Sequence, residues 1–287
     1  MASLVVDVVG AADGHDEASP ERNIDAPGET EPRTAPSEPA AAAHDDDDRP
    51  DTEPLKFAYD AAAHDLRGLI AAALGLDEAE LGRAHCHLDA DTAKAPSRRR
   101  NWGSKSSRNE YNRRWRSLSS ADPGLASRFS EAYGRFVAEV CAPLVSGGLE
   151  HGVVYQKVPT LRIGVPQDKP LGKRHCDAEY GHQPAEVNFW IPLTACAGSN
   201  TLWTESRPGE GDFAPLEGGL GDGFRFDGNQ CVHYTVPNET DTTRVSLDFR
   251  VVAKHRHDDH FVGGCALRDG KNIARFRVGG WYAEAAR

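Results

Sequence analysis

The chain has 287 residues, 39% of them hydrophobic, and a formal net charge of −11. Residues 1–54 hold fifteen acidic and three basic side chains, whereas the other 233 residues hold twenty-nine and thirty, so the acidity is no sign of a substrate or partner. No apolar run is long enough to span a membrane, and six scattered cysteines without a CxxC pair indicate a reducing compartment, so we expect a cytoplasmic protein.

The first segment, residues 1–54, is rich in Ala, Pro, Glu and Asp. Such a composition buries too little apolar surface to offset the entropy of ordering, so we expect a disordered tail. An acidic interaction arm is the weaker alternative. We expect residues 55–287 to form one domain.

Residues 55–150 are expected to be mainly helical and to support the rest of the domain. The run at 57–76 is rich in Ala and Leu, with apolar residues at helical spacing. A second helix is indicated by the sequence SADPG at 120–124, which combines a capping residue with proline. Behind it follows an apolar stripe typical of core, made of Leu125, Phe129, Tyr133, Phe136, Val137 and Val140.

Between these helices, residues 98–116 carry eight basic side chains and one acidic one, interleaved with Trp102, Tyr111 and Trp115. Basic and aromatic residues together can indicate nucleic-acid binding. That function is disfavoured because the stretch is short, the domain is close to neutral and no nucleic-acid-binding motif accompanies it. A solvated loop, or a flap that helps to bind an anionic substrate, is the preferred interpretation.

Residues 151–254 consist of short strand-like runs separated by Gly, Pro, Asn and Asp. Seven such runs at regular spacing, without a helical pattern between them, predict an all-β barrel or sandwich. Residues 255–287 are expected to form a C-terminal extension, with an edge strand or a helix at 273–282. The runs are VVYQKV, TLRIGV, EVNFWIPL, NTLWTES, GFRFDG, CVHYTV and TRVSLDFRVV.

A candidate metal site begins at His175 and Asp177, which follow the run TLRIGV. On a strand, residues i and i+2 point to the same face, so both side chains can aim into the barrel. Together they supply two ligands of a 2-His-1-carboxylate triad, which leaves coordination positions open. The third ligand must come from a distant strand, and His233 in QCVHYTV is the natural candidate.

A candidate cosubstrate site follows in TRVSLDF, where Arg244 and Ser246 share a strand face. An arginine and a hydroxyl so placed can hold the far carboxylate of a keto diacid, with the guanidinium forming a bidentate pair. The acid's keto end would then chelate the metal. Arg250 is the alternative clamp, but the R-x-S pattern favours Arg244.

From about residue 155 to 252 the chain resembles the Fe(II)/2-oxoglutarate-dependent oxygenase superfamily, and more closely its streptomycin-biosynthesis-protein-like (StrG-like) branch. The resemblance implies a double-stranded β-helix (cupin-like jelly roll) with flanking helices. It also implies Fe(II) at His175, Asp177 and His233, 2-oxoglutarate at Arg244 and Ser246, and O2 as cosubstrate. The matching stretches are PTLRIGVP, the run from His175 to Thr194, NTLWTES, FDGNQCVH and RVSLDFRVV.

The resemblance further implies hydroxylation of a small polar metabolite, such as an amino acid, a peptide intermediate or an aminoglycoside-like compound, in an antibiotic or other specialised-metabolite pathway. Desaturation, cyclisation or epimerisation on the same metal site is the alternative, and a non-catalytic binding module is another. Halogenation is disfavoured because halogenases of this superfamily replace the carboxylate with a small residue, whereas this chain has Asp177.

Other polar residues of the motif region are candidates for substrate or cosubstrate contact. Arg162 is either a substrate or cosubstrate contact or an ion-pair partner. The amide of Asn188 could bind the 2-oxoglutarate carboxylate. Tyr180 and His182 lie on a loop expected at the rim. Glu205 could bind a cationic substrate group or pair with an arginine such as Arg162.

Two further groups are not assigned to the metal. Cys176 occupies the middle position of the HxD motif and should point away. The late cluster at 255–260 holds three histidines and two aspartates, but a polar turn explains it as well, so a second metal is disfavoured.

Overall fold

The computed structural model describes residues 53–87, 105–167, 170–261 and 277–285. Most of the predicted tail at 1–54 therefore lies outside the described residues. Within the described ranges the strands are accompanied by five α-helices and one π-helical turn: α1 (Leu66–Leu74), α3 (Lys105–Arg116), α4 (Leu118–Ala121), α5 (Pro123–Phe136), α6 (Gly148–His151) and the π-helical turn η3 (Val137–Cys141). The 3₁₀ segments are η2 (Glu78–His87), η4 (Ala142–Leu144), η5 (Asp177–Tyr180) and η6 (Lys254–Arg256).

The strands form two antiparallel sheets. The larger has the order β1-β7-β4-β9-β2-β10, with β3 also paired to β9, and the smaller has the order β6-β5-β8. The chain is thus mainly β with flanking helices, and closure into a double-stranded β-helix stays a prediction. The strands are β1 (Leu55–Ala58), β2 (Val153–Gln156), β3 (Thr160–Gly164), β4 (Val187–Pro192), β5 (Trp203–Thr204), β6 (Ala214–Pro215), β7 (Asp222–Phe226), β8 (His233–Tyr234), β9 (Arg244–Ala253) and β10 (Tyr282–Glu284).

Each of the seven predicted runs contains a strand: β2, β3, β4, β5, β7, β8 and β9. The C-terminal extension adds β10, an edge strand that pairs with β2. It shares only residue 282 with the range 273–282, where an edge strand or a helix was expected, and residues 273–276 lie outside the described part of the chain. Strands β1 and β6 were not predicted. Among the described residues, none of the helices combines the length and the apolarity needed to cross a bilayer.

The first predicted helix, 57–76, is wrong in its first half. Phe57 lies on β1 opposite Gly223 of β7, and a Cβ on that glycine would come within 2.3 Å of the Phe57 ring. The phenyl ring packs against Phe189 of β4, with centroids 6.0 Å apart. Helix α1 begins only at Leu66, after Asp65 has capped it by accepting from an amide of the first turn. Pairing with the sheet therefore prevails over helical propensity here.

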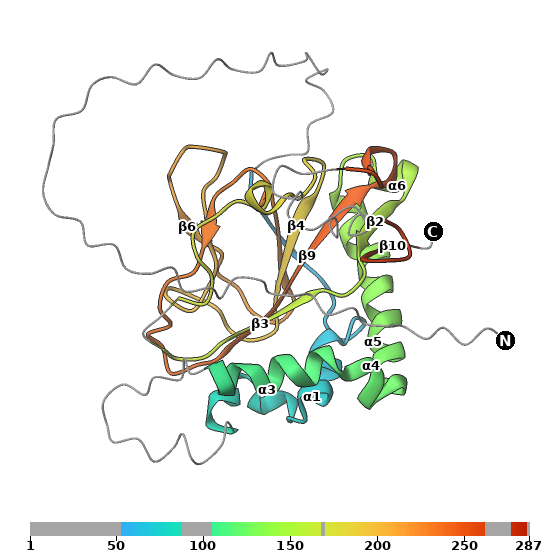
Figure 1. Cartoon of the computed structure of the whole chain (residues 1–287). Helices are drawn as coiled ribbons and strands as arrows, with labels where there is room; N and C mark the ends of the chain where they lie inside the picture. Colours follow the sequence, from blue (N-terminus) through green and yellow to red (C-terminus); the bar gives the residue numbers. More distant parts are fainter. Residues whose placement is uncertain (1–52, 88–104, 168–169, 262–276, 286–287) are drawn as a thin grey trace, which may run out of the picture.

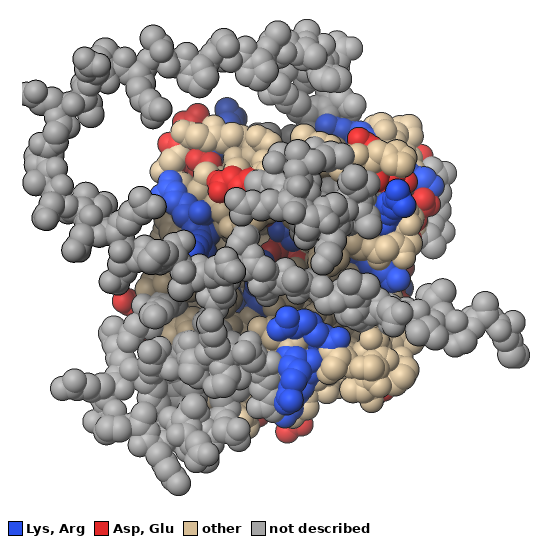
Figure 2. Space-filling view, viewed as in Figure 1, with Lys and Arg blue, Asp and Glu red and all other residues tan. Residues whose placement is uncertain are grey.

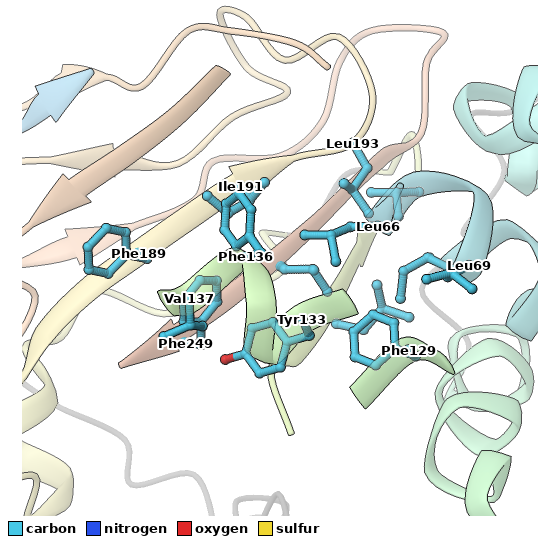
Figure 3. Packing of buried hydrophobic residues seen from close by; sticks show 14 of the residues in the cluster. Leu66, Leu69, Phe129, Tyr133, Phe136, Val137, Phe189, Ile191, Leu193 and Phe249 are labelled. Carbon is cyan, nitrogen blue, oxygen red and sulfur yellow. The ribbon is translucent and has the colours of Figure 1, made fainter. Parts of the chain in front are cut away.

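The second predicted helix is confirmed as α5. Asp122 is its N-cap and accepts from the amide of Leu125 at 2.9 Å, and Pro123 opens the first turn. The apolar stripe of this helix faces the sheet, where Tyr133 and Phe136 meet Phe249 of β9 with centroids 5.1 and 6.5 Å apart. Figure 3 shows these rings between the helix and strands β4 and β9. The main core therefore lies between the helices and one face of the large sheet.

The basic segment is helical rather than a loop or flap in its described part, α3, while residues 98–104 lie outside the described residues. Tyr111 is buried and donates to the carbonyl of Ala84, and Trp115 packs edge-on against Phe129 at 4.8 Å. The arginines at 113, 114 and 116 are exposed. Figure 2 shows basic side chains gathered over the region where α3 lies in Figure 1. Two of the segment's aromatic residues thus anchor a helix to the core.

Strand β9 divides the domain into an apolar and a polar side. Its alternate residues from Val245 to Ala253 belong to the main core. The residues that alternate with them, Arg244, Ser246, Asp248, Arg250 and Val252, point to the opposite face, as alternation on a strand requires. The first four are polar, and Val252 belongs to a small separate apolar cluster. The polar side is the side on which the candidate site is built.

Candidate metal centre

His175 and His233 are paired directly, although 58 positions separate them. They form an isolated antiparallel bridge, in which the amide of each donates to the carbonyl of the other at 3.2 and 2.9 Å. His233 is also the first residue of β8, opposite Thr204 of β5. Backbone pairing therefore fixes the separation of the two imidazoles, whose ring centroids lie 4.5 Å apart.

Asp177 reaches the two histidines by a different route from the one predicted. It is the first residue of η5, with Cys176 as the cap, so the HxD motif leaves the strand before its carboxylate. The amide of Asp177 donates to the carbonyl of Gly228 at 2.8 Å, which ties this turn to the loop before His233. The predicted grouping of His175 with Asp177 is thus reproduced, but a turn and not strand parity brings it about. The thiol of Cys176, the middle residue of the motif, lies 3.6 Å from Oε1 of Glu179.

Both imidazoles are oriented by backbone carbonyls two residues earlier. Nδ1 of His175 bonds the carbonyl of Lys173 at 2.7 Å, and Nδ1 of His233 bonds that of Cys231 at 3.1 Å. A carbonyl only accepts, so each Nδ1 carries a proton, and in the neutral imidazole each Nε2 presents a lone pair. The two Nε2 atoms lie 3.7 and 3.8 Å from Oδ1 of Asp177.

These three groups have the donor set and the spacing of a metal site. The ligand atoms of His175, Asp177 and His233 all lie within 4.8 Å of one another, and within the described ranges they are the one such group of histidine, cysteine or carboxylate side chains. Two neutral imidazoles and a carboxylate suit a divalent transition metal, and the triad leaves coordination positions open. The late histidines do not converge: the ring of His255 lies 4.1 Å from that of His151 at a tilt of 50°, while His257 lies 3.5 Å from Asp259.

The second oxygen of Asp177 is occupied by the protein. Oδ2 accepts from Nε and Nη2 of Arg250 at 2.9 and 2.7 Å and from Nδ2 of Asn188 at 2.7 Å. Burial alone would raise the pKa of the Asp177 carboxyl, but the charge of Arg250, with His233, His182 and the Asn188 hydrogen bond, holds it well below its usual range. The carboxyl is therefore ionised and offers Oδ1 to a ligand.

Arg250 and Asn188 consequently differ from their predicted roles. Arg250, the alternative cosubstrate clamp, is engaged with Asp177 and also lies 3.3 Å from Gln156. Asn188, predicted to bind 2-oxoglutarate, directs its amide nitrogen at Asp177, and its buried Oδ1 has no hydrogen-bond partner among the described residues. An unpaired acceptor cannot hold a carboxylate.

Arg244, the predicted clamp, is buried but unpaired. The residue is 4% exposed, its Nε is buried without a partner, and no described group forms a hydrogen bond or ion pair with its guanidinium. Burial lowers its pKa to about 10, so the group stays charged at neutral pH. It lines a small cavity together with Gly164, Gln167, Leu171, Ser199, Asn200, Thr235, Val236 and Asn238.

The cavity lined by Arg244 is linked to the triad through Thr235. This residue also lines the cavity and follows His233 by two positions, so the Cα atoms of Thr235 and His233 are at most about 7 Å apart. Ser246, also predicted to bind the cosubstrate, is fully buried and accepts from the indole of Trp190 at 3.1 Å, which leaves its own hydroxyl proton available. A cation of this kind, buried without a counter-ion, is costly unless an anion binds to it.

Arg162 and Glu205 are not paired with each other. Nη2 of Arg162 lies 3.3 Å from Oδ2 of Asp248, one of the polar residues of β9. Glu205 is buried and accepts from the amides of Val232 and Gly211 at 2.6 and 3.1 Å. It thus fixes the backbone directly before His233.

Tyr180 and His182 occupy different environments. Tyr180 is 37% exposed with its ring 5.0 Å from that of His175, as expected for the rim. His182, in contrast, is buried, so its predicted place at the rim is wrong. Its Nδ1 lies 2.6 Å from Glu186, which also accepts from the hydroxyl of Tyr282 on β10.

Comparison with known proteins agrees with the motifs. No family model matches the chain. The streptomycin biosynthesis protein StrG of Streptomyces griseus is 38% identical over 112 residues, which cover 39% of this chain and 53% of that protein. The matched part of the chain thus spans about half the length of this curated relative.

Solved structures give more distant likenesses. A non-haem monooxygenase, the ThoJ–Ni complex, has 16% identity and a TM-score of 0.41 over 71% of this chain and 74% of its own. AviO1 from Streptomyces viridochromogenes Tue57 has 16% identity and a TM-score of 0.39 over 71% and 91%. At such values these likenesses are too distant to carry an assignment. The similarity to StrG confirms the predicted resemblance to StrG-like proteins.

Proposed function

We propose that the chain is a non-haem iron(II)/2-oxoglutarate-dependent oxygenase. One combination of features carries the proposal: three metal-ligand atoms converge, and a buried arginine without an ion-pair partner lines a cavity that also includes Thr235, two residues after His233. Metal binding alone would not require such a cation. A keto diacid satisfies both features, because one end chelates a metal and the other pairs with a guanidinium.

In this proposal His175, His233 and Asp177 hold iron(II). Bound with 2-oxoglutarate and O2, the metal would supply the oxidising chemistry, with decarboxylation of the 2-oxoglutarate. The protein's share is to fix, through the carbonyls of Lys173 and Cys231, the neutral tautomer in which Nδ1 carries the proton and Nε2 faces the metal, and to keep Asp177 ionised.

Arg244 and Ser246 would hold the far carboxylate of 2-oxoglutarate. The guanidinium supplies two parallel N–H donors, and the Ser246 hydroxyl adds a third while its oxygen is held by Trp190. Because both residues are buried, water competes little for these donors. Asn188 is reassigned in this proposal from 2-oxoglutarate to Asp177, since its amide nitrogen is engaged there.

The substrate would be a small polar metabolite of a specialised pathway, such as an amino acid, a peptide intermediate or an aminoglycoside-like compound, and hydroxylation is the reaction we favour. The support is the similarity to a streptomycin biosynthesis protein over about half of that protein's length. Tyr180 and Arg162 are the candidate substrate contacts, because both side chains are partly exposed. His182 and Glu205 serve the interior network instead.

The test is an anaerobic titration of the full chain with Fe(II) and then 2-oxoglutarate, followed by the visible charge-transfer absorption of their complex. We expect a band for the wild-type protein, none for His175→Ala, and an unchanged band for His260→Ala, which removes an exposed histidine outside the triad. A wild-type protein without the band, or His175→Ala with it, would contradict the proposal. Product analysis then separates hydroxylation from desaturation, cyclisation or epimerisation.

A further inference from the structure

One oxygen of the Asp177 carboxylate accepts hydrogen bonds from Arg250 and Asn188, and metal binding by the triad does not by itself require these bonds. We propose that Arg250 and Asn188 form a carboxylate cradle that forces Asp177 to bind the metal through Oδ1 alone. This inference rests on the proposed function for the identity of the metal. The contacts of the cradle belong to this chain's own residues and can be tested with a metal alone.

The geometry of Arg250 carries the first step. Its Nε and Nη2 both donate to the same oxygen, Oδ2 of Asp177, at 2.9 and 2.7 Å, rather than one to each oxygen. A guanidinium normally pairs with a carboxylate through two parallel bonds, one to each oxygen. In this orientation the guanidinium occupies Oδ2 with two hydrogen bonds, and Oδ1 faces the two imidazoles.

Asn188 completes the cradle from the neighbouring strand. Its position on β4 is directly opposite Arg250 on β9, so the two side chains rise from adjacent sites of one sheet face. Nδ2 of Asn188 gives Oδ2 a third hydrogen bond at 2.7 Å. With three donors on one oxygen, the carboxylate cannot turn to chelate the metal with both oxygens unless it gives up these bonds.

Gly228 provides the space for this amide. A Cβ at position 228 would lie 2.5 Å from Cγ and Nδ2 of Asn188, which is closer than real contacts allow. The carbonyl of the same glycine accepts the Asp177 amide at 2.8 Å. Gly228 thus holds the main chain of the metal ligand while leaving room for the side chain that orients its carboxylate. This explains a glycine in the FDGNQCVH stretch.

The orientation of Arg250 is fixed in turn by Gln156 of β2. Nη1 of Arg250 lies 3.3 Å from Oε1 of Gln156, whose own amide donates to the carbonyl of Val158 at 2.8 Å. All of these side chains are buried. Arg250 already neutralises the negative charge of Asp177. A divalent metal bound there would therefore keep a net charge of about +2 for its remaining ligands, and a doubly charged keto diacid would balance that charge.

The experiment measures Co(II) binding by the metal-free full chain, through visible absorption, without any cosubstrate. Lysine at position 250 keeps the charge but loses the fork, so we expect Arg250→Lys to weaken Co(II) binding about 10- to 100-fold and to change the band shape. Asn188→Ala and Gly228→Ala should weaken it less. Arg225→Lys is the matched control: it changes a buried arginine of β7 that bonds the carbonyl of Leu144 instead of Asp177, so binding should be unchanged.

Each outcome decides between the cradle and the proposed function. If a folded Arg250→Lys binds Co(II) with wild-type affinity and spectrum, the cradle is wrong and the proposed function stands. Should that variant not fold, wild-type binding by both Asn188→Ala and Gly228→Ala overturns the cradle. If the wild-type protein binds Co(II), the variants bind it weakly, and 2-oxoglutarate added afterwards in a separate titration does not bind, the cradle stands and the proposed function fails. A wild-type protein that binds no Co(II) overturns both.

Discussion

The two faces of strand β9 are both largely buried, but one is apolar and the other is mostly polar. Toward the helices lie Val245, Leu247, Phe249 and Val251, all 0% exposed. Toward the metal site lie Arg244, Ser246 and Arg250, at most 7% exposed, together with the less buried Asp248. The side chains of the first face are stabilised by close packing against one another, whereas each buried charge on the second face needs a partner of opposite charge.

The partners on the polar face differ from one arginine to the next. Arg250 is paired with Asp177 and Arg162 with Asp248, while Arg244 forms no ion pair with a described residue. A cation left unmatched in an otherwise balanced face marks the place where a ligand's charge belongs. The apolar face therefore contributes to stability through packing, and the polar face is where the proposed function places ligand binding.

The largest effect on stability should come from the apolar face. Phe249→Ala removes a ring stacked on Phe189 and in edge contact with Tyr133, and we expect the free energy of unfolding to fall by about 3–5 kcal/mol. Urea denaturation of the metal-free protein measures it. Co(II) affinity of the folded fraction should change little. A large loss of affinity at full stability would break the division between the faces.

Arg244→Met should behave in the opposite way. We expect 2-oxoglutarate affinity to fall about 100-fold, equivalent to about 2.7 kcal/mol, because a charge-assisted pair is lost. The unfolding free energy without ligand should not fall, since a buried charge without a counter-ion is replaced by an apolar chain of similar length. Calorimetry and urea denaturation give the two quantities. A variant destabilised as strongly as Phe249→Ala would show that Arg244 is structural.

Much of the fold was predictable because residues that favour turns mark the ends of the strands. Gly, Pro and Asn separate runs rich in β-branched and aromatic residues, and the sequence locates a strand in every one of the seven runs. Strand β1 was missed because its position is decided by a distant partner: Phe57 fits against Gly223, and the Ala- and Leu-rich residues after it suggested a helix. Long-range pairing of this kind leaves no local pattern.

The site was predictable for residues whose chemistry stands out in a motif, and less so for their supports. The grouping of His175, Asp177 and His233 follows from the HxD motif and a distant histidine. The contact of Arg250 with Asp177 joins residues 73 positions apart and depends on the turn at η5, which interrupts the expected strand. The carbonyls that orient the imidazoles belong to the backbone, which every residue has, so the sequence could not predict these contacts.

Glu205 tests whether the polar side extends beyond β9. Burial raises the pKa of its carboxyl, but hydrogen bonds from the amides of Val232, Gly211 and Gly209 outweigh this and lower the pKa. Glu205→Gln replaces one acceptor oxygen with a donor that faces these amides, so we expect the unfolding free energy to fall by about 2 kcal/mol.

The same lowered pKa gives this contribution a pH dependence. It is fully present above the ordinary pKa of 4.5 and is lost as pH falls through the lower pKa of the folded state. Urea denaturation between pH 3 and pH 7, with Glu205→Gln beside the wild type, should therefore show the two curves converging at the acid end. Parallel curves over the whole range would mean that the charge of Glu205 is not what stabilises the loop.

The smallest effect should come from the pair of Arg162 and Asp248, where the polar face meets solvent. One contact of 3.3 Å joins them, and the arginine side chain is 38% exposed, so water screens the attraction. In a double-mutant cycle with Arg162→Met and Asp248→Asn, we expect a coupling free energy below about 1 kcal/mol. If Arg162 contacts the substrate, Arg162→Met should then raise KM while leaving the Co(II) affinity and the unfolding free energy almost unchanged. A coupling of several kcal/mol would instead place this pair with Arg250 and Asp177, as a part of the structure that no substrate displaces.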